Sequence, residues 1–239
     1  MMGVQVIEGE CLEKMAALPS GSVDLILTDL PYGTTKNAWD SVIPFEPMWR
    51  EYRRICRGAI LLTASQPFTS TLVCSALDIF KYAWVWEKGS ATGHLNAKRM
   101  PMKLHEDVLV FAAGAHSYNP QGLVPFGKTV KRGNNGTNFD ASGKENFQEF
   151  TNYPRSILRF PAEEKALHPT QKPVALFEYL IKTYTNEGDT VLDCCAGSGT
   201  TGIAARNCGR NAILIEREPK YLEVIRNRLA DGPLFAEAM

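Results

Sequence analysis

The tetrapeptide Asp29-Leu30-Pro31-Tyr32 brings together a carboxylate, a backbone restrained by proline and an aromatic ring. It ends the apolar run Val23 to Asp29, which is typical of a strand buried on both faces. Open α/β sheets bind ligands at the carboxyl ends of such strands. A carboxylate and a backbone carbonyl accept two hydrogen bonds from an amino group, and a ring can stack on a flat base. The motif therefore indicates a binding site for the amino group of a flat base, with a helix-capping Asp29 as the alternative.

A second motif places Gly197, Gly199 and Gly202 in a G-x-G-x-x-G spacing between a strand and a helix. Glycines at these positions let the backbone approach a ligand closely. Glu216 follows at the end of the next strand, where a carboxylate can bind a ribose hydroxyl pair. This arrangement predicts a pocket for an adenosine-containing cofactor. A tight turn with a surface glutamate is the alternative.

The glycine spacing also fits an NAD-dependent dehydrogenase, but its place in the chain argues against one. Only about 40 residues follow Gly199, too few to build a sheet, so the other strands must precede the loop. Hydrophobic patterning predicts these strands and helices in alternation. The expected helices are Phe45 to Cys56 (stopped by Gly58), Pro67 to Leu77, the segment after Pro173, Thr200 to Asn207 and Pro219 to Leu229. The expected further strands are Ala59 to Ala64, Tyr82 to Trp86, Asp107 to Phe111, Thr190 to Cys194 and Ala212 to Glu216. The pair Tyr82 to Trp86 and Asp107 to Phe111 either continues the alternation or forms an antiparallel edge. We therefore expect a doubly wound, circularly permuted α/β fold with a loop-bearing insertion from Gly114 to Leu167.

Composition is that of an ordinary globular protein, with 239 residues of which 44% are hydrophobic and 22% charged. No apolar run approaches the roughly 18 residues of a membrane span, and the first residues lack a signal-peptide pattern, so the expected location is cytoplasmic, without a membrane partner. The six cysteines show no metal-ligand spacing, so neither a metal nor a disulfide framework is expected, and buried reduced thiols are the favoured interpretation.

Four segments in this order, DLPYGTT, HPTQKP, DCCAGSGTT and IEREPKYLEVIRNRL, resemble the beta group of S-adenosylmethionine-dependent DNA amino-methyltransferases, and their phage and prophage members in particular. The resemblance covers nearly the whole chain. It implies a catalytic half at 1–113, a target-recognition insertion at 114–167 and a cofactor-binding half at 168–239.

The resemblance also implies roles for individual residues. Its catalytic motif would be Asp29, Leu30, Pro31 and Tyr32, although Leu30 stands where the family usually has proline. The base would be flipped and stacked on Tyr32, whose hydroxyl we expect to be dispensable. The implied S-adenosylmethionine contacts are Glu10, Cys11, Asp29, Thr170, Gln171, Lys172, Asp193, Ala196, Gly197, Ser198, Gly199, Thr200 and Glu216.

Charge distribution points to the middle of the chain as the DNA contact. Net charge is zero, but Lys88 to Lys165 carries 11 Lys and Arg against 7 Asp and Glu. The expected DNA contacts are Lys98, Arg99, Lys103, Lys128, Lys131, Arg132, Asn134, Asn135, Asn138, Arg155 and Arg159. Double-stranded DNA is the expected partner, and a homodimer is compatible with the sequence. We expect methylation of adenine N6; the alternatives are cytosine N4 methylation and a catalytically weak, cofactor-dependent DNA-binding protein.

Overall fold

The structure is a computed structural model that describes residues 3–33, 40–131, 145–163, 167–168 and 170–230, the side chain of Lys131 excepted. The chain divides into two units, one formed by residues 1–119 with 156–239 and the other by residues 120–155. The second unit lies within the predicted insertion 114–167. It contains an antiparallel pair of strands, β6 (Val124–Lys131) and β7 (Glu145–Thr151).

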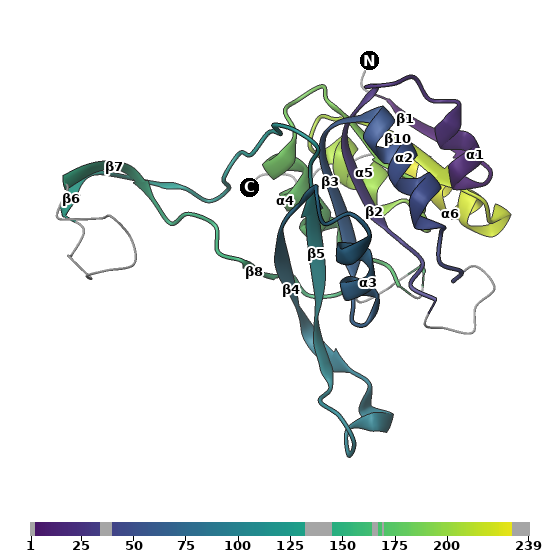
Figure 1. Cartoon of the computed structure of the whole chain (residues 1–239), viewed down its shortest axis with the longest axis horizontal. Helices are drawn as coiled ribbons and strands as arrows, with labels where there is room; N and C mark the ends of the chain where they lie inside the picture. The colour runs from purple at the N-terminus through teal and green to yellow at the C-terminus, as the bar shows by residue number, and fades with distance from the viewer. Residues whose placement is uncertain (1–2, 34–39, 132–144, 164–166, 169, 231–239) are drawn as a thin grey trace. The chain divides into compact units, whose positions relative to one another are not determined.

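The first unit is built on one mixed sheet (Figure 1). β5 is the one strand of this sheet that runs antiparallel to its neighbours. The sheet order is β1 (Val4–Glu8), β10 (Asn211–Glu216), β9 (Thr190–Asp193), β2 (Val23–Asp29), β3 (Cys56–Ala64), β5 (Lys103–Phe111), β4 (Phe80–Thr92) and β8 (Ile157–Arg159). This order confirms the doubly wound α/β fold, whereas circular permutation stays a prediction.

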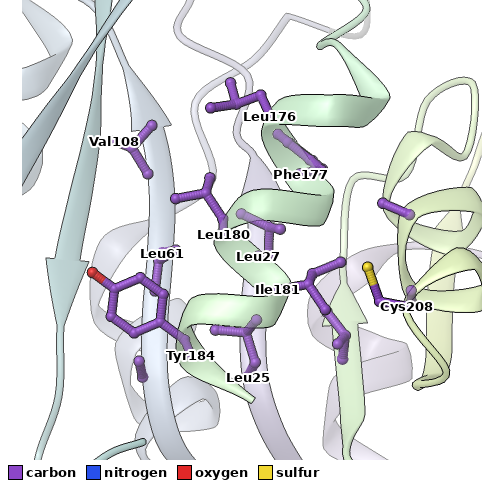
Figure 2. Packing of buried hydrophobic residues seen from close by; sticks show 14 of the residues in the cluster. Leu25, Leu27, Leu61, Val108, Leu176, Phe177, Leu180, Ile181, Tyr184 and Cys208 are labelled. Atoms are coloured by element: carbon purple, nitrogen blue, oxygen red, sulfur yellow. The ribbon is translucent and has the colours of Figure 1, made fainter. Parts of the chain in front are cut away.

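Helices cover both faces of the sheet because its strands direct apolar side chains toward both faces. One face packs against α1 (Cys11–Ala16), α2 (Phe45–Ile55) and α3 (Phe68–Ser75). The other packs against α4 (Val174–Tyr184), α5 (Thr200–Asn207) and α6 (Pro219–Ala230). Figure 2 shows α4 directing Leu176, Leu180 and Tyr184 onto this second face. Each fully buried side chain of this kind stabilises the fold by roughly 1.5–3 kcal/mol.

From the sequence we expected Gly58 to stop the second helix, and this expectation is wrong. Helix α2 ends at Ile55, and Gly58 lies inside β3. A Cβ at position 58 would lie 2.0 Å from the backbone oxygen of Asp24 in the neighbouring strand. The glycine therefore permits close pairing of β3 with its neighbouring strand. Reading this glycine only as a helix breaker misses that role.

The predicted strands Tyr82 to Trp86 and Asp107 to Phe111 form an antiparallel pair, which is one of the two arrangements that the sequence left open, and they are longer than the sequence indicated. β4 continues to Thr92 and β5 begins at Lys103, so the pair extends past the sheet and joins through a short 3₁₀ helix, His94–Asn96 (Figure 1). We call residues 89–105 the arm; all of them are exposed. The sequence hides the arm because exposed strands lack the apolar alternation of half-buried ones.

Two elements near the start of the chain, β1 and α1, went unpredicted. β1 is only five residues long and pairs with β10 at the edge of the sheet. Among the described residues, no helix is long and apolar enough to cross a membrane.

Candidate active site

A cavity of about 430 Å³ opens at the carboxyl ends of β2, β9 and β10. This is the point where the strand order reverses, since β2 and β9 are neighbours and the chain proceeds outward from them in both directions. Every residue predicted for catalysis or cofactor binding lines the cavity except Gly199. Gly199 instead begins α5 with a left-handed φ of 77°, and a Cβ there would press on Ile225 at 3.0 Å.

The glycine loop is held by the carboxylate of Glu216. Its Oε2 accepts a 2.7 Å hydrogen bond from the backbone N–H of Gly197, and its Oε1 accepts from the N–H groups of Arg217 and Glu218. Three of roughly four acceptor positions are thereby used, which leaves one for a ligand hydroxyl. Burial raises the pKa of Glu216 above its usual value, while the backbone donors oppose that shift.

The predicted segment 170–172 packs on the same loop. Gln171 Oε1 accepts a 3.1 Å hydrogen bond from the Ser198 hydroxyl, and the His168 ring lies 4.3 Å from the ring of Tyr221 on α6. A Cβ on Gly197 would lie 3.6 Å from the His168 ring. The structure therefore brings together the two motifs of the cofactor half, which are separate in the sequence.

Asp193 lies beneath the loop and is almost fully buried. Its carboxylate accepts hydrogen bonds from Thr28 at 2.7 Å, from the backbone N–H of Cys195 at 3.1 Å and from Thr201. Burial raises the pKa of Asp193 to about 6, against the lowering effect of these donors. Asp193 thus ties β2, β9 and α5 together at the cavity floor.

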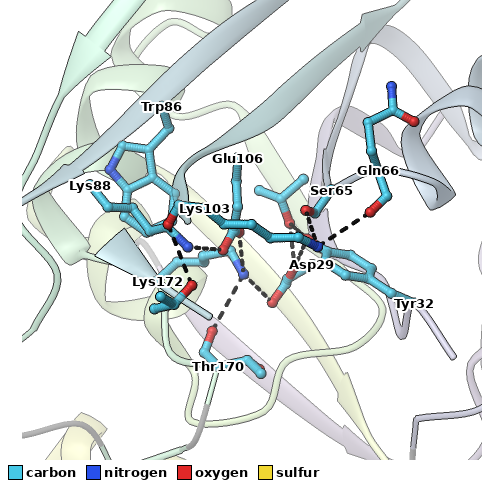
Figure 3. Close-up of polar contacts among 12 residues, drawn as sticks. Asp29, Tyr32, Ser65, Gln66, Trp86, Lys88, Lys103, Glu106, Thr170 and Lys172 are labelled. Carbon is cyan, nitrogen blue, oxygen red and sulfur yellow. Dashed lines mark hydrogen bonds and ion pairs between the residues drawn. The ribbon is translucent and has the colours of Figure 1, made fainter. Parts of the chain in front are cut away.

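Asp29 ends β2 in a dense hydrogen-bond network (Figure 3). Its Oδ1 accepts from the hydroxyls of Tyr32, at 2.9 Å, and Thr63. Its Oδ2 accepts from the ammonium of Lys172 at 2.6 Å. Burial, with Asp29 and Glu106 nearby, raises the pKa of Tyr32 well above its usual value, so its hydroxyl remains a donor. The Tyr32 ring stacks on Phe68, with centroids 5.1 Å apart.

Several residues of this site were missed by the sequence analysis. Thr63 at the end of β3, Lys88 on β4 and Glu106 on β5 contact the Asp29 network or line the cavity. Position at a strand end was the available signal for Thr63. For Glu106 no local pattern indicates a link to Lys172.

The predicted DNA contacts divide between the two units. Lys98, Arg99 and Lys103 lie on the exposed arm, which adjoins the cavity because Thr92 lines it. Lys128 and Arg155 are exposed in the 120–155 unit, and Arg159 on β8 pairs with Glu87 at 3.2 Å. Lys131 ends β6, and the remaining predictions, Arg132, Asn134, Asn135 and Asn138, lie outside the described residues.

The cysteines are all free, but only part of the burial expectation holds. Cys11, Cys194 and Cys208 are buried, whereas Cys74 is exposed. Cys194 Sγ lies 3.0 Å from the hydroxyl of Tyr52, and Cys195 lines the cavity. Within the described ranges, no group of three or more His, Cys, Asp or Glu is placed to hold a metal ion.

The fold is that of the S-adenosylmethionine-dependent DNA methyltransferases. The chain superposes on the crystal structure of the M1.HpyAVI–SAM complex with a TM-score of 0.64 and 24% identity, covering 94% of this chain and 99% of the other. It superposes on the PvuII cytosine-N4-specific DNA methyltransferase with a TM-score of 0.71 and 15% identity, covering 99% and 88%.

Sequence comparison assigns the family. Residues 23–227 match the family model described as DNA methylase, and the chain belongs to this family of S-adenosylmethionine-dependent DNA methyltransferases. It is 31% identical over 245 residues to the DNA adenine methyltransferase YhdJ of Escherichia coli, covering 94% of this chain and 82% of that protein. It is 28% identical over 240 residues to the type II methyltransferase M.HpaI of Haemophilus parainfluenzae, covering 95% and 74%. The predicted family and cofactor are therefore confirmed, as is the general enzyme class, an S-adenosylmethionine-dependent DNA methyltransferase, whereas adenine N6 specificity stays a prediction.

Proposed function

We propose that this protein methylates the N6 amino group of adenine in double-stranded DNA. The observation that carries the proposal is the acceptor arrangement at Asp29. A carboxylate offers about four acceptor positions, and Tyr32, Thr63 and Lys172 occupy three of them. One position on Oδ2 is left at the cavity, which suits a single N–H of an exocyclic amino group.

The backbone carbonyl of Leu30 supplies the second acceptor of the grip. Leu30 lines the cavity next to Asp29, and its carbonyl needs no particular side chain, so the replacement of the family's usual proline leaves this oxygen available. Two acceptors on the two amino hydrogens would orient the nitrogen lone pair out of the ring plane. This orientation matters because the lone pair is otherwise delocalised into the purine and is a poor nucleophile. Positioning of this kind supplies much of a transfer enzyme's rate.

The residues of the glycine loop fit S-adenosylmethionine, which supplies an electrophilic methyl group on a sulfonium. Glu216 would hold the ribose through its remaining acceptor position, Gly197 and Ser198 would border the methionine part, and Glu10 with Cys11 would border the adenine. Glycine at 197 fits this role because its φ is 51° and a Cβ would project toward His168.

Proton transfer follows bond formation in this mechanism. The amino nitrogen would bond to the methyl carbon as the bond from that carbon to the sulfonium sulfur breaks, with S-adenosylhomocysteine as the leaving group. The nitrogen would then be cationic and its N–H strongly acidic. The Asp29 carboxylate, already hydrogen bonded to that N–H, stabilises the developing charge and then accepts the proton. Asp29 is too weak a base to deprotonate the neutral amine beforehand.

The arm is the DNA contact that the described residues favour. Residues 89–105 include Lys98, Arg99 and Lys103 but no acidic residue, so the arm offers a continuous attraction for phosphates. Leu95 at its tip is 99% exposed, and Met100, Met102 and Leu104 of the arm are exposed as well, so the arm presents several apolar side chains of the kind found at contact surfaces. We infer that Leu95 enters the base stack as the target base leaves it, as apolar wedges do in other DNA-bending proteins.

Adenine is favoured over cytosine by two observations. The first motif position is Asp29, which the resemblance associates with adenine, and the curated relative YhdJ is named as an adenine enzyme. The fold alone does not choose, because the PvuII enzyme is cytosine-N4-specific. Cytosine N4 methylation is therefore the second candidate.

The experiment uses the full chain, labelled S-adenosylmethionine and unmethylated duplex DNA of mixed sequence. Nucleosides from the digested product are quantified by mass spectrometry. N6-methyladenine as the main product supports the proposal, and N4-methylcytosine supports the second candidate. Cofactor and DNA binding without product would support the catalytically weak DNA-binding protein. Sequencing that reads modified bases then gives the target site.

A further inference from the structure

Four charged side chains of alternating sign run from the catalytic motif across the sheet (Figure 3). Asp29 Oδ2 lies 2.6 Å from Lys172 Nζ, Lys172 Nζ lies 3.3 Å from Glu106 Oε2, and Glu106 Oε1 lies 2.9 Å from Lys88 Nζ. The four residues come from β2, the segment before α4, β5 and β4. Their formal charges sum to zero.

Lys172 is the most enclosed member, with a side chain only 5% exposed. Its ammonium faces Asp29, Glu106 and the Thr170 carbonyl, and it lies 5.9 Å from the centre of the Tyr32 ring. A buried ammonium with three such neighbours has little freedom to turn. Whatever fixes Lys172 therefore also fixes the Asp29 oxygen that it contacts.

Glu106 holds Lys172 by charge rather than by a hydrogen bond. Its Oε2 is buried and has no hydrogen-bond partner among the described residues, although the Lys172 ammonium is within ion-pair distance. Buried ion pairs contribute little net stability, because desolvation offsets their attraction. A purely stabilising role is therefore a weak explanation for four such charges at the wall of a cavity.

We propose that Glu106 is a positioning residue for methyl transfer, which balances the charge of Lys172 and, by sharing its ammonium with Asp29, keeps Lys172 on a single acceptor position of Asp29 Oδ2. This inference rests on the proposed function. Without the Glu106 charge, the cluster would carry a net positive charge beside the amino nitrogen that becomes cationic. Lys172 would also turn wholly toward Asp29 and compete with the base for the last acceptor position.

The test compares Glu106→Gln with Glu87→Gln, a matched carboxylate-to-amide control in the neighbouring strand, whose partner is the exposed Arg159. For Glu106→Gln we expect kcat to fall at least about tenfold while KM for S-adenosylmethionine changes by less than about threefold, since the lost interaction acts in the transition state. Glu87→Gln should retain the wild-type kcat. Unchanged kcat in Glu106→Gln would overturn the proposal, as would an equal loss in both variants.

A double-mutant cycle tests whether Glu106 acts through Lys172. We expect Lys172→Met to lower activity by itself, and adding Glu106→Gln should cause less than about a twofold further loss. Independent, multiplicative losses would overturn the proposal. If thermal denaturation shows that Glu106→Gln folds poorly, Glu106→Asp replaces it, because aspartate keeps the negative charge. A kcat of Glu106→Asp above that of Lys172→Met and of the soluble fraction of Glu106→Gln supports the charge role. A kcat no higher than theirs contradicts it.

The pH profile gives a readout that a structural role would not move. Lys172 faces Asp29, Glu106 and Tyr32, with Lys88 behind Glu106 and His168 on the cavity side. Removing one of the two anions that raise the pKa of Lys172 should move the alkaline limb of kcat to lower pH. An unmoved limb contradicts the inference. The proposed function itself fails separately, if the wild-type protein forms no N6-methyladenine.

Discussion

The hydroxyl of Tyr32 donates a 2.9 Å hydrogen bond to Oδ1 of Asp29, three residues earlier in the chain. The catalytic motif is therefore folded back on itself, and its aromatic residue contributes a polar group to the carboxylate. The sequence led us to expect a ring that only stacks on the base and a dispensable hydroxyl. This contact gives the hydroxyl a role in fixing the carboxylate.

Tyr32→Phe should consequently lower kcat. Hydrogen bonds to charged groups contribute about 1.5–3 kcal/mol, which corresponds to roughly a tenfold to hundredfold loss if the bond matters fully in the transition state. Tyr32→Ala should lose more, because the ring also packs on Phe68. Methyl transfer at saturating cofactor measures both, with Tyr82→Phe as a control far from the cavity. Wild-type rates in Tyr32→Phe would restore the simpler stacking interpretation.

Asp29→Asn should abolish detectable transfer and leave cofactor binding largely intact, because in the proposed mechanism this carboxylate binds the amino group of the base. The amide places an N–H where an acceptor is needed. Calorimetry gives the cofactor affinity, and product analysis gives the rate. Asp78→Asn, at an exposed carboxylate paired with Arg53, serves as the control for fold and handling. Substantial activity in Asp29→Asn would reject the proposed grip.

Glu216→Gln should show the opposite behaviour. We expect weaker S-adenosylmethionine binding by roughly 1.5–3 kcal/mol, through loss of a charge-assisted hydrogen bond and looser anchoring of Gly197. Transfer at saturating cofactor should be less affected than affinity. Glu223→Gln on the exposed side of α6 is the matched control. Equal affinity in both variants would remove Glu216 from the cofactor site.

The arm should govern how duplex DNA binding responds to salt. Lys98→Ala combined with Arg99→Ala is expected to reduce the slope of log affinity against log salt by about 1–2, since each lost phosphate contact contributes about 0.9. Lys81→Ala, at the opposite end of β4, is the control. If the slope is unchanged while Lys131→Ala with Arg132→Ala reduces it, the main phosphate contact belongs to the 120–155 unit.

Leu95→Ala should reduce methylation of a fully paired duplex more than methylation of a duplex whose target adenine is mispaired. A mispaired base leaves the stack at lower cost, so a wedge matters less for it. Rates on the two substrates are compared at saturating DNA. An equal reduction on both substrates would assign Leu95 to binding alone.

Asp193 should make the free energy of unfolding depend on pH. Its folded-state pKa, about 6, lies above the value in an unfolded chain, so the folded protein binds the extra proton between about pH 4 and pH 6. Stability is therefore greater below this window and declines as pH rises through it, by up to about 3 kcal/mol. Urea unfolding of wild type and Asp193→Asn at pH 4.5 and 7 isolates this contribution. If the wild-type protein and Asp193→Asn differ in unfolding free energy by the same amount at both pH values, Asp193 is not the source of the pH dependence.

Local pattern predicted most of the fold, whereas most of the cavity lining followed from the resemblance to a known family. The run from Val23 to Asp29 is β2, and the predicted helix Thr200 to Asn207 is α5, since both have strong apolar periodicity and clear boundaries. The exposed arm and the short edge strand β1 lacked that signal. Lys172 shows a different limit, because its partner Asp29 is 143 residues away. Such pairing depends on strand order, which no local spacing encodes.

The reversed direction of β5 determines where the arm can be. β4 runs parallel to β3, so it ends at the same edge of the sheet as Asp29, and an antiparallel successor must start at that edge. A parallel successor would have needed a helical crossover and would have left no hairpin beside the cavity. The arm can thus be lengthened or shortened in steps of paired residues without altering the order of the sheet. Under the proposed role of the arm in DNA binding, its reach along the duplex becomes a property that insertions and deletions can tune while the chemistry stays fixed.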